Sequence, residues 1–137
     1  MAKILIVDDQ NQPRADLVWA AKGPDRQIVE AMTMEEAIDK IAKESFDLVI
    51  TDLELVRGER DTSGLKVLQA AKERDVYTQV IVCTYYGSPA TSVEAMRLGA
   101  FDYMERNPVG IDHLSVLSMK ITQALEFRAA KLPEKTH

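Results

Sequence analysis

The chain contains little cysteine, and it lacks both a long apolar run and a cluster of basic residues. Cys83 is its single cysteine, which excludes an internal disulfide bond and a cysteine-rich zinc site. Cys83 ends the apolar run Val80-Ile81-Val82-Cys83, so we expect a buried and chemically inert thiol. A redox function based on paired cysteines within this chain is therefore excluded.

The absence of long apolar and basic segments limits the possible partners. No apolar run approaches the ~20 residues that a transmembrane helix needs. Lys3 is followed by four apolar residues and then two acids, unlike a signal peptide. The 17 basic and 22 acidic residues give a net charge of −5, which disfavours binding to nucleic acid or to anionic membranes. We expect a cytoplasmic protein with no direct nucleic-acid partner and no membrane partner.

Short β-branched runs alternate with longer amphipathic segments along the 137 residues. The runs expected to form strands are residues 4–7, 27–32, 46–51, 79–84 and 101–104. The expected helices begin near residues 13, 33, 63, 88 and 112, and the last runs to about residue 131. Thr33 with Glu36 is typical of a capping box, and Ser88 before Pro89 marks a helix start.

Five β–α units in succession predict one α/β domain over residues 1–131, with a parallel sheet covered by helices on both faces. Residues 132–137 contain Pro133 and are expected to form a frayed tail. In open sheets of this kind, ligands bind beyond the carboxyl ends of the strands. The residues at those ends are therefore the candidates for function.

Acidic residues end two of the predicted strands. Asp8 and Asp9 follow the first strand, Asp52 follows the third, and Thr84 ends the fourth. Converging carboxylates repel one another by about 1–4 kcal/mol per pair at ~4 Å. A divalent cation offsets this repulsion, and carboxylate oxygens with an open position suit Mg²⁺. The acids therefore favour a Mg²⁺ site rather than three unrelated turn residues.

Four blocks in this order resemble the bacterial two-component response-regulator receiver domain. They are Ile4-Leu5-Ile6-Val7-Asp8-Asp9, Asp47-Leu48-Val49-Ile50-Thr51-Asp52, Val80-Ile81-Val82-Cys83-Thr84 and Ala95-Met96-Arg97-Leu98-Gly99-Ala100-Phe101-Asp102-Tyr103. The resemblance covers about residues 3–128. It implies a flavodoxin-like fold with five parallel strands in the order 2-1-3-4-5.

The resemblance also implies a phosphoacceptor site. Asp52 would accept a phosphoryl group from a histidine kinase or phosphotransfer protein. Asp9 and Asp52 would bind Mg²⁺ directly, Asp8 would bind it through water, and the backbone carbonyl of Glu54 would complete the protein ligands. A carboxylate nucleophile of this kind forms an aspartyl phosphate. The reading of Glu54 as a solvated loop acid remains open.

Two further residues match the family's switch. Thr84 would hydrogen-bond the phosphoryl group, and Tyr103 would turn inward as Thr84 moves. The surface of the last helix–strand–helix segment would then bind an output protein or domain, or form a homodimer. Thr84 as a plain strand residue and Tyr103 as a static aromatic remain open alternatives.

The sequence departs from the family at the lysine that pairs with the phosphoryl group. No lysine occurs between Lys72 and Lys120, and we expect Arg106 to be the substitute cation. Arginine is larger and planar, so it is not equivalent to lysine. The alternative is a surface arginine that pairs with Glu105 or another neighbour.

Two departures surround the predicted site. Gly64 stands 12 residues after Asp52, whereas the family usually reaches its helix-starting glycine about eight residues after the phosphoacceptor. The longer loop carries the charged residues Arg57, Glu59, Arg60 and Asp61, which form either a lid or partner contact, or a tolerated insertion. Tyr85 replaces a commonly small residue after Thr84. We expect its ring to narrow access to the phosphoryl site and to slow phosphoryl exchange.

These observations leave three hypotheses for function. The first is a phosphorylation-controlled switch that is not an enzyme beyond its own phosphorylation and dephosphorylation. The second is a pseudo-receiver, a phosphorylation-independent interaction module with the same fold. The third, a flavodoxin-like binder or a phosphohydrolase, is disfavoured because no glycine-rich loop follows the first strand and Glu54 replaces the second aspartate of aspartate-based phosphatases.

Overall fold

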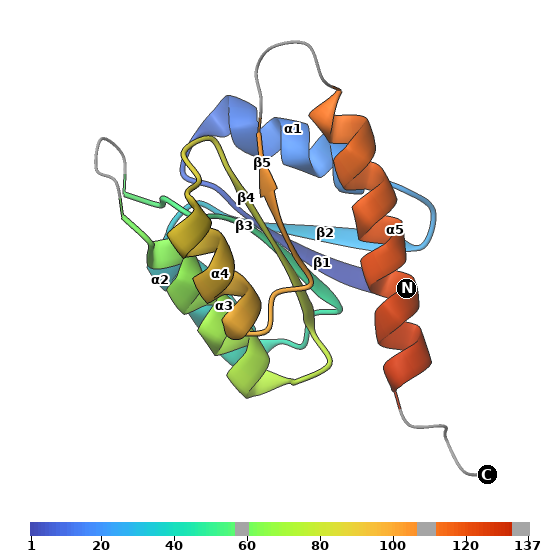
Figure 1. Cartoon of the computed structure of the whole chain (residues 1–137). Coiled ribbons are helices and arrows are strands. Elements are labelled where there is room, and N and C mark those ends of the chain that lie inside the picture. Colours follow the sequence, from blue (N-terminus) through green and yellow to red (C-terminus); the bar gives the residue numbers. More distant parts are fainter. Residues whose placement is uncertain (57–60, 107–111, 133–137) are drawn as a thin grey trace, which may run out of the picture.

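The computed structural model describes residues 1–56, 61–106 and 112–132. Five parallel strands form one sheet in the order β2-β1-β3-β4-β5, which confirms the predicted fold (Figure 1). The strands are β1 (Ala2–Val7), β2 (Arg26–Ala31), β3 (Leu48–Asp52), β4 (Gln79–Thr84) and β5 (Asp102–Glu105). Each boundary lies within two residues of its prediction, because the β-branched runs correctly indicated where the chain is extended.

Within the described part of the chain, five helices cover the two faces of the sheet. They are α1 (Asn11–Ala21), α2 (Met34–Lys43), α3 (Ser63–Arg74), α4 (Pro89–Arg97) and α5 (His113–Lys131). Helices α2, α3 and α4 lie on one face, and α1 and α5 lie on the other (Figure 1). None of the helices in the described ranges is both long and apolar enough to cross a membrane.

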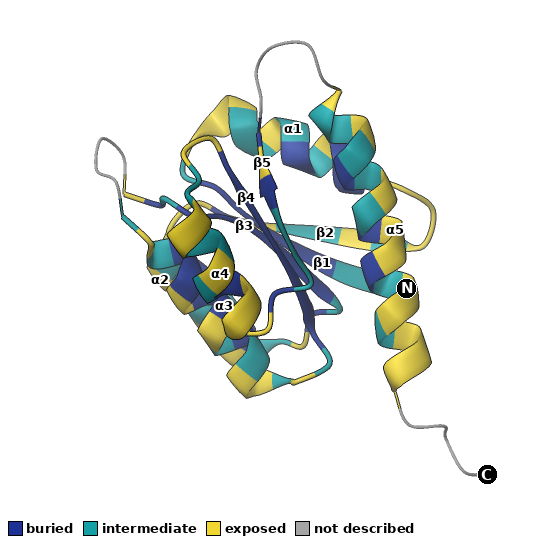
Figure 2. Cartoon of the chain, viewed as in Figure 1, coloured by how far each residue is buried: buried dark blue, intermediate teal, exposed yellow. Residues whose placement is uncertain are grey.

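The alternation of side chains along the strands divides the core into two layers. Leu5 and Val7 of β1 point to the layer under α2 and α3, whereas Ile4 and Ile6 point to the layer under α1 and α5. Every residue of β3 and β4 is buried, as Figure 2 shows for the centre of the sheet. Both faces of these strands are covered, which explains their continuous apolar runs.

Cys83 lies in the α1/α5 layer and is completely buried. Burial raises the pKa of its thiol to about 12. The prediction of a buried thiol is confirmed. The thiolate is the reactive form of cysteine, so the raised pKa disfavours reaction at Cys83.

The helix ends follow the signals in the sequence. Ser88 Oγ accepts the N–H of Thr91 at 3.2 Å, Pro89 opens α4, and Gly99 after α4 has a φ of 98°. Thr33 Oγ1 accepts the N–H of Glu36 at 3.0 Å. The other half of that predicted capping box differs, because the Glu36 carboxylate accepts the N–H of Met32 instead, at 3.5 Å.

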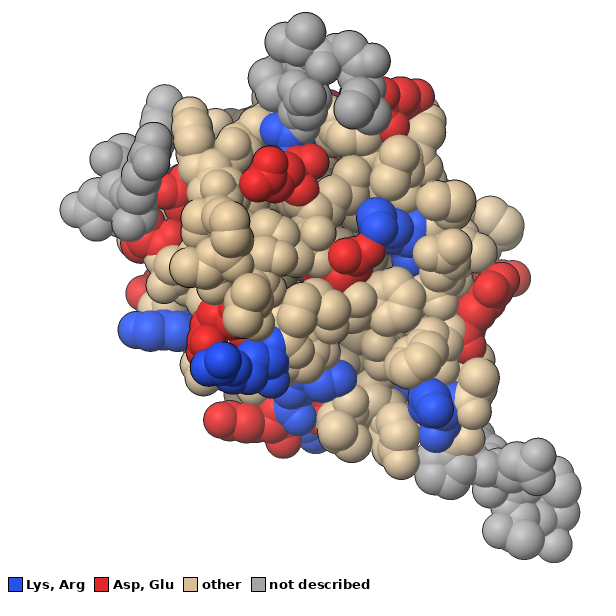
Figure 3. All heavy atoms as spheres, in the orientation of Figure 1, with Lys and Arg blue, Asp and Glu red and all other residues tan. Residues whose placement is uncertain are grey.

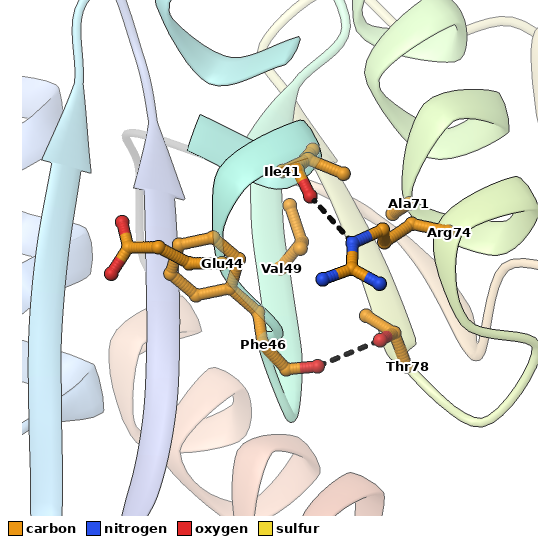
Figure 4. A pocket seen from close by; sticks show the side chains of 7 residues that line it. All are labelled: Ile41, Glu44, Phe46, Val49, Ala71, Arg74 and Thr78. Carbon is orange, nitrogen blue, oxygen red and sulfur yellow. Dashed lines mark hydrogen bonds between the residues drawn. The ribbon is translucent and has the colours of Figure 1, made fainter. Parts of the chain in front are cut away.

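Hydrogen bonds join α2, α3 and the sheet at the amino ends of β3 and β4 (Figure 4). Arg74 Nε donates to the carbonyl of Ile41 at 3.2 Å, and Thr78 Oγ1 donates to the carbonyl of Phe46 at 2.7 Å. These bonds fasten the end of the sheet opposite to Asp8 and Asp52.

Candidate functional site

Three acidic side chains converge at the carboxyl ends of β1 and β3. These two strands are neighbours in register, with Val7 beside Thr51, so the residues that follow lie side by side. One carboxylate oxygen from each of Asp8, Asp9 and Asp52 lies within 4.8 Å of the others. The structure therefore brings together the three acids that the sequence singled out.

Burial disfavours the ionised forms of two acids in this cluster, Asp8 and Asp52. Burial and the neighbouring charge of Asp8 raise the pKa of Asp52 from 3.8 to about 7, although the N–H of Glu54 donates to Asp52 Oδ1 at 3.2 Å. Burial also raises the pKa of Asp8, against the opposing effects of the Gln10 N–H and Arg106. A cation bound among these oxygens would favour their ionised forms, so the donor set fits Mg²⁺.

Arg106 is the cation that the structure places beside these acids. Its side chain is 1% exposed, and its Nη1 donates to Asp8 Oδ2 at 3.2 Å. The alternative of a surface arginine paired with Glu105 is therefore wrong. The chain turns inward directly after β5, where the Arg106 N–H donates to the carbonyl of Thr84 at 2.7 Å. This bond sets Arg106 at the end of β4, within reach of the acids.

Thr84 and Tyr103 occupy neighbouring strands but have different partners. Thr84 is buried at the end of β4, and its Oγ1 accepts the N–H of Tyr86 at 3.1 Å. Tyr103 is half-buried on β5, and its hydroxyl lies 2.8 Å from Thr91 Oγ1 at the start of α4. In this arrangement the Tyr103 hydroxyl contacts α4 rather than the acid cluster.

The loop after Asp52 is folded back on itself where it is described. Leu53 and Leu55 are buried in the core, and Asp61 accepts the N–H of Val56 at 3.0 Å and that of Ser63 at 2.8 Å. Of the loop's charged residues, Arg57, Glu59 and Arg60 lie outside the described residues. The hypothesis of a lid at residues 57–61 therefore stays a prediction.

Some functional contacts were not indicated by the sequence. The carbonyl of Pro13 accepts Arg106 Nη2 at 3.1 Å, and backbone carbonyls leave no signal in residue type. Gly64 allows α3 to start against Asp52, because a Cβ at this position would lie 2.0 Å from the Asp52 carbonyl oxygen. The glycine itself was visible in the sequence, but its contact with the acceptor strand was not.

Tyr85 lies against Arg106. The arginine Cζ stands 4.6 Å from the centroid of the Tyr85 ring, and the Tyr85 residue is 37% exposed. A guanidinium over an aromatic face is held by electrostatic attraction to the ring. The ring thus has a specific partner inside the site, which the expectation of narrowed access did not include.

Comparison with known proteins agrees with the fold. The family model of the response regulator receiver domain matches residues 4–115. Response regulator protein PilR of Pseudomonas aeruginosa is 34% identical over 132 residues, which cover 96% of this chain and 28% of PilR. Acid tolerance regulatory protein ActR of Rhizobium meliloti is 32% identical over 90% of this chain and 61% of ActR. The chain thus spans less than two thirds of these relatives.

Solved structures show the same similarity. A CheY-like receiver domain protein from Methanospirillum hungatei JF-1 has a TM-score of 0.82 and 26% identity, over 96% of this chain and 99% of the other. A beryllofluoride-activated NtrC4 receiver domain dimer has a TM-score of 0.76 and 26% identity, over 93% and 99%. Both matches extend over nearly the whole length of each chain.

Proposed function

The chain belongs to the response regulator receiver family, and on that premise we propose that Asp52 is its phosphoacceptor in two-component signalling. The observation that carries the assignment is the convergence of Asp8, Asp9 and Asp52 within 4.8 Å beside a buried arginine. Asp52 alone of the three lies within a strand, as the last residue of β3 at the centre of the sheet. The other two acids stand on the neighbouring β1 side.

The phosphoryl transfer requires Asp52 in its ionised form. A carboxylate oxygen of Asp52 attacks phosphorus, the P–N bond to the donor histidine breaks, and the imidazole leaves with the electron pair and takes up a proton. The pKa of about 7 applies to Asp52 without a bound metal ion, and such an ion would favour the ionised form. Arg106 and the N–H of Glu54 add positive potential at the same carboxylate.

We propose Mg²⁺ as the cofactor, held by Asp9 and Asp52 directly, by Asp8 through water and by the Glu54 carbonyl. The ion would neutralise charge on the transferring phosphoryl group. The buried Asp8 is already engaged by Gln10 and Arg106, which is consistent with an indirect role for its carboxylate. Asp9 is only partly buried and remains accessible from solvent.

Phosphorylation would be read out through Thr84 and Tyr103. The Thr84 hydroxyl, which accepts the Tyr86 N–H in this structure, would donate its own proton to a phosphoryl oxygen. Tyr103 would leave Thr91 as the loop between β4 and α4 moves. The altered surface includes α4, β5 and α5, where positive and negative side chains are interspersed (Figure 3). Its partner would be an output protein or domain, or a second copy of this chain.

The pseudo-receiver alternative is not favoured. A phosphorylation-independent module has no need for three carboxylates that repel one another, two of them buried. The chain differs from the family at Tyr85 and Arg106, but the three acids are all present. Arg106 supplies a positive charge beside them. They alter the surroundings of the acceptor without removing it.

The test is incubation with Mg²⁺ and acetyl phosphate, followed by intact-mass measurement. We expect the wild type to gain the mass of one phosphoryl group and Asp52→Asn to gain none. Asp39→Asn, at an exposed carboxylate on α2, is the matched control and should be modified like the wild type. An unmodified wild type, tested also with phosphoramidate, would overturn the proposal in favour of the pseudo-receiver.

A further inference from the structure

The guanidinium of Arg106 is enclosed by three separate parts of the chain. Its Nη1 donates to Asp8 Oδ2 at the end of β1, and its Nη2 donates to the carbonyl of Pro13 in α1, at 3.2 and 3.1 Å. The ring of Tyr85, from the loop after β4, covers it at 4.6 Å. The side chain is 1% exposed, so these contacts replace solvent around the charge.

These contacts fix the orientation of the cation as well as its position. A guanidinium is planar, and two acceptors on different elements define the direction of its fork. The Tyr85 ring restrains the third direction, perpendicular to that plane. An ammonium group on a flexible stem would have no comparable restraint, because it has neither a plane nor a fork.

One donor of this cation is unused within the described ranges. Arg106 Nε is buried and has no hydrogen-bond partner there. A buried unsatisfied donor is energetically unfavourable unless an acceptor arrives to pair with it. A phosphoryl oxygen is an acceptor of the required kind, and planar guanidinium donors pair well with phosphate.

We propose that Tyr85 is a positioning residue that acts through Arg106, since its ring and the Pro13 carbonyl hold the guanidinium in the orientation used during phosphoryl transfer to Asp52. The inference rests on the proposed function and deepens it. In this proposal the Tyr85 ring holds the Arg106 guanidinium and does not merely obstruct the site. Tyr85 and Arg106 then act as one unit in place of a single lysine.

Positioning and obstruction predict opposite results for substitutions of Tyr85. Leucine keeps much of the bulk but loses the aromatic face, and phenylalanine keeps the face but loses the hydroxyl. If the ring only obstructs, Tyr85→Ala reacts faster than the wild type and Tyr85→Leu reacts like it. If the ring positions Arg106, both Tyr85→Leu and Tyr85→Ala react more slowly, and Tyr85→Phe restores the rate.

The first measurement is the rate constant of Asp52 phosphorylation in Mg²⁺ as a function of acetyl phosphate concentration, which separates the limiting rate constant from the half-saturating donor concentration. A cation–π contact at a desolvated site corresponds to about three- to thirtyfold in rate, which is the loss of the limiting rate constant expected for Tyr85→Leu and Tyr85→Ala. Tyr77→Leu is the matched control, because Tyr77 precedes the other end of β4. It should react like the wild type. A wild-type rate for Tyr85→Leu, or a faster rate for Tyr85→Ala, would overturn the proposal.

The second measurement needs neither phosphoryl transfer nor metal. The Arg106 Nε–H proton resonance in the metal-free protein reports the ring current of Tyr85. We expect this resonance to move in Tyr85→Leu and to keep its position in Tyr85→Phe and Tyr77→Leu. An unmoved resonance in Tyr85→Leu refutes the contact whatever the reaction shows. If the wild type itself is not phosphorylated, the proposed function fails, and the resonance still decides whether Tyr85 holds Arg106.

Discussion

Replacing Asp52 by asparagine should stabilise the metal-free protein at high pH. The pKa of Asp52 is raised from 3.8 to about 7 by burial and by the charge of Asp8. The folded protein therefore binds this proton more tightly than the unfolded chain does. The destabilising effect of the ionised carboxylate is absent below about pH 4, grows as the pH rises, and is complete above about pH 7.

The size of the effect follows from the two pKa values. At about 1.4 kcal/mol for each pH unit between them, the ionised Asp52 destabilises the fold by up to about 4 kcal/mol. Asparagine has nearly the same shape without the charge, so Asp52→Asn should gain about 2–4 kcal/mol in free energy of unfolding at pH 8. The gain should vanish near pH 4.

Urea unfolding with a metal chelator at pH 4, 6 and 8 measures this difference. Asp39→Asn, at an exposed carboxylate paired with Lys43, is the control and should change the free energy of unfolding by less than about 1 kcal/mol at every pH. Added Mg²⁺ should reduce the advantage of Asp52→Asn, because the ion binds the ionised cluster. A variant no more stable than the wild type at pH 8, or a gain independent of pH, would refute the reasoning.

Three further predictions concern the residues around the acceptor. Gly64→Ala should lower the free energy of unfolding, measured in urea, by more than about 3 kcal/mol, because the added Cβ would lie 2.0 Å from the Asp52 carbonyl oxygen. Gly23→Ala is the control and should change it by less than about 1 kcal/mol, because its Cβ meets only the flexible Arg26 side chain, at 3.3 Å. Arg106→Met should destabilise the metal-free protein by about 3 kcal/mol at pH 8 by calorimetry. The loss should be smaller at pH 4, because burial raises the pKa of Asp8 and so favours its neutral form as the pH falls, and an equal loss at both pH values would contradict this. Thr84→Val should leave Mg²⁺ affinity unchanged in titration calorimetry but abolish phosphorylation-dependent shifts of Tyr103 in NMR spectra, and persistent shifts would exclude Thr84 from the switch.

Much of the fold could be predicted because its signals are local. β-branched runs buried on both faces indicated β1, β3 and β4, and the Ser88-Pro89 pair indicated the start of α4. The acid cluster also followed from the sequence. Parallel strands end at one edge of a sheet, so residues such as Asp8 and Asp52 must lie close together once the strands are neighbours.

The contacts of Arg106 could not be predicted from the sequence. They depend on how the chain turns after β5 and on the backbone carbonyl of Pro13, and neither is encoded by residue type or spacing. The position of Tyr85 over the guanidinium likewise depends on the path of the loop after β4. The sequence showed only that Tyr85 is a bulky residue beside the site, which suggested obstruction. Its contact with Arg106 indicates that it positions the guanidinium instead.

The most direct test of the central claim is to locate the phosphoryl group among the three clustered carboxylates. Borohydride reduction of the protein treated with Mg²⁺ and acetyl phosphate converts an aspartyl phosphate into homoserine, and peptide mass spectrometry then identifies its position. The account predicts homoserine at position 52 and unmodified aspartate at Asp8 and Asp9. Homoserine at position 8 or 9, or at none of the three, would contradict it.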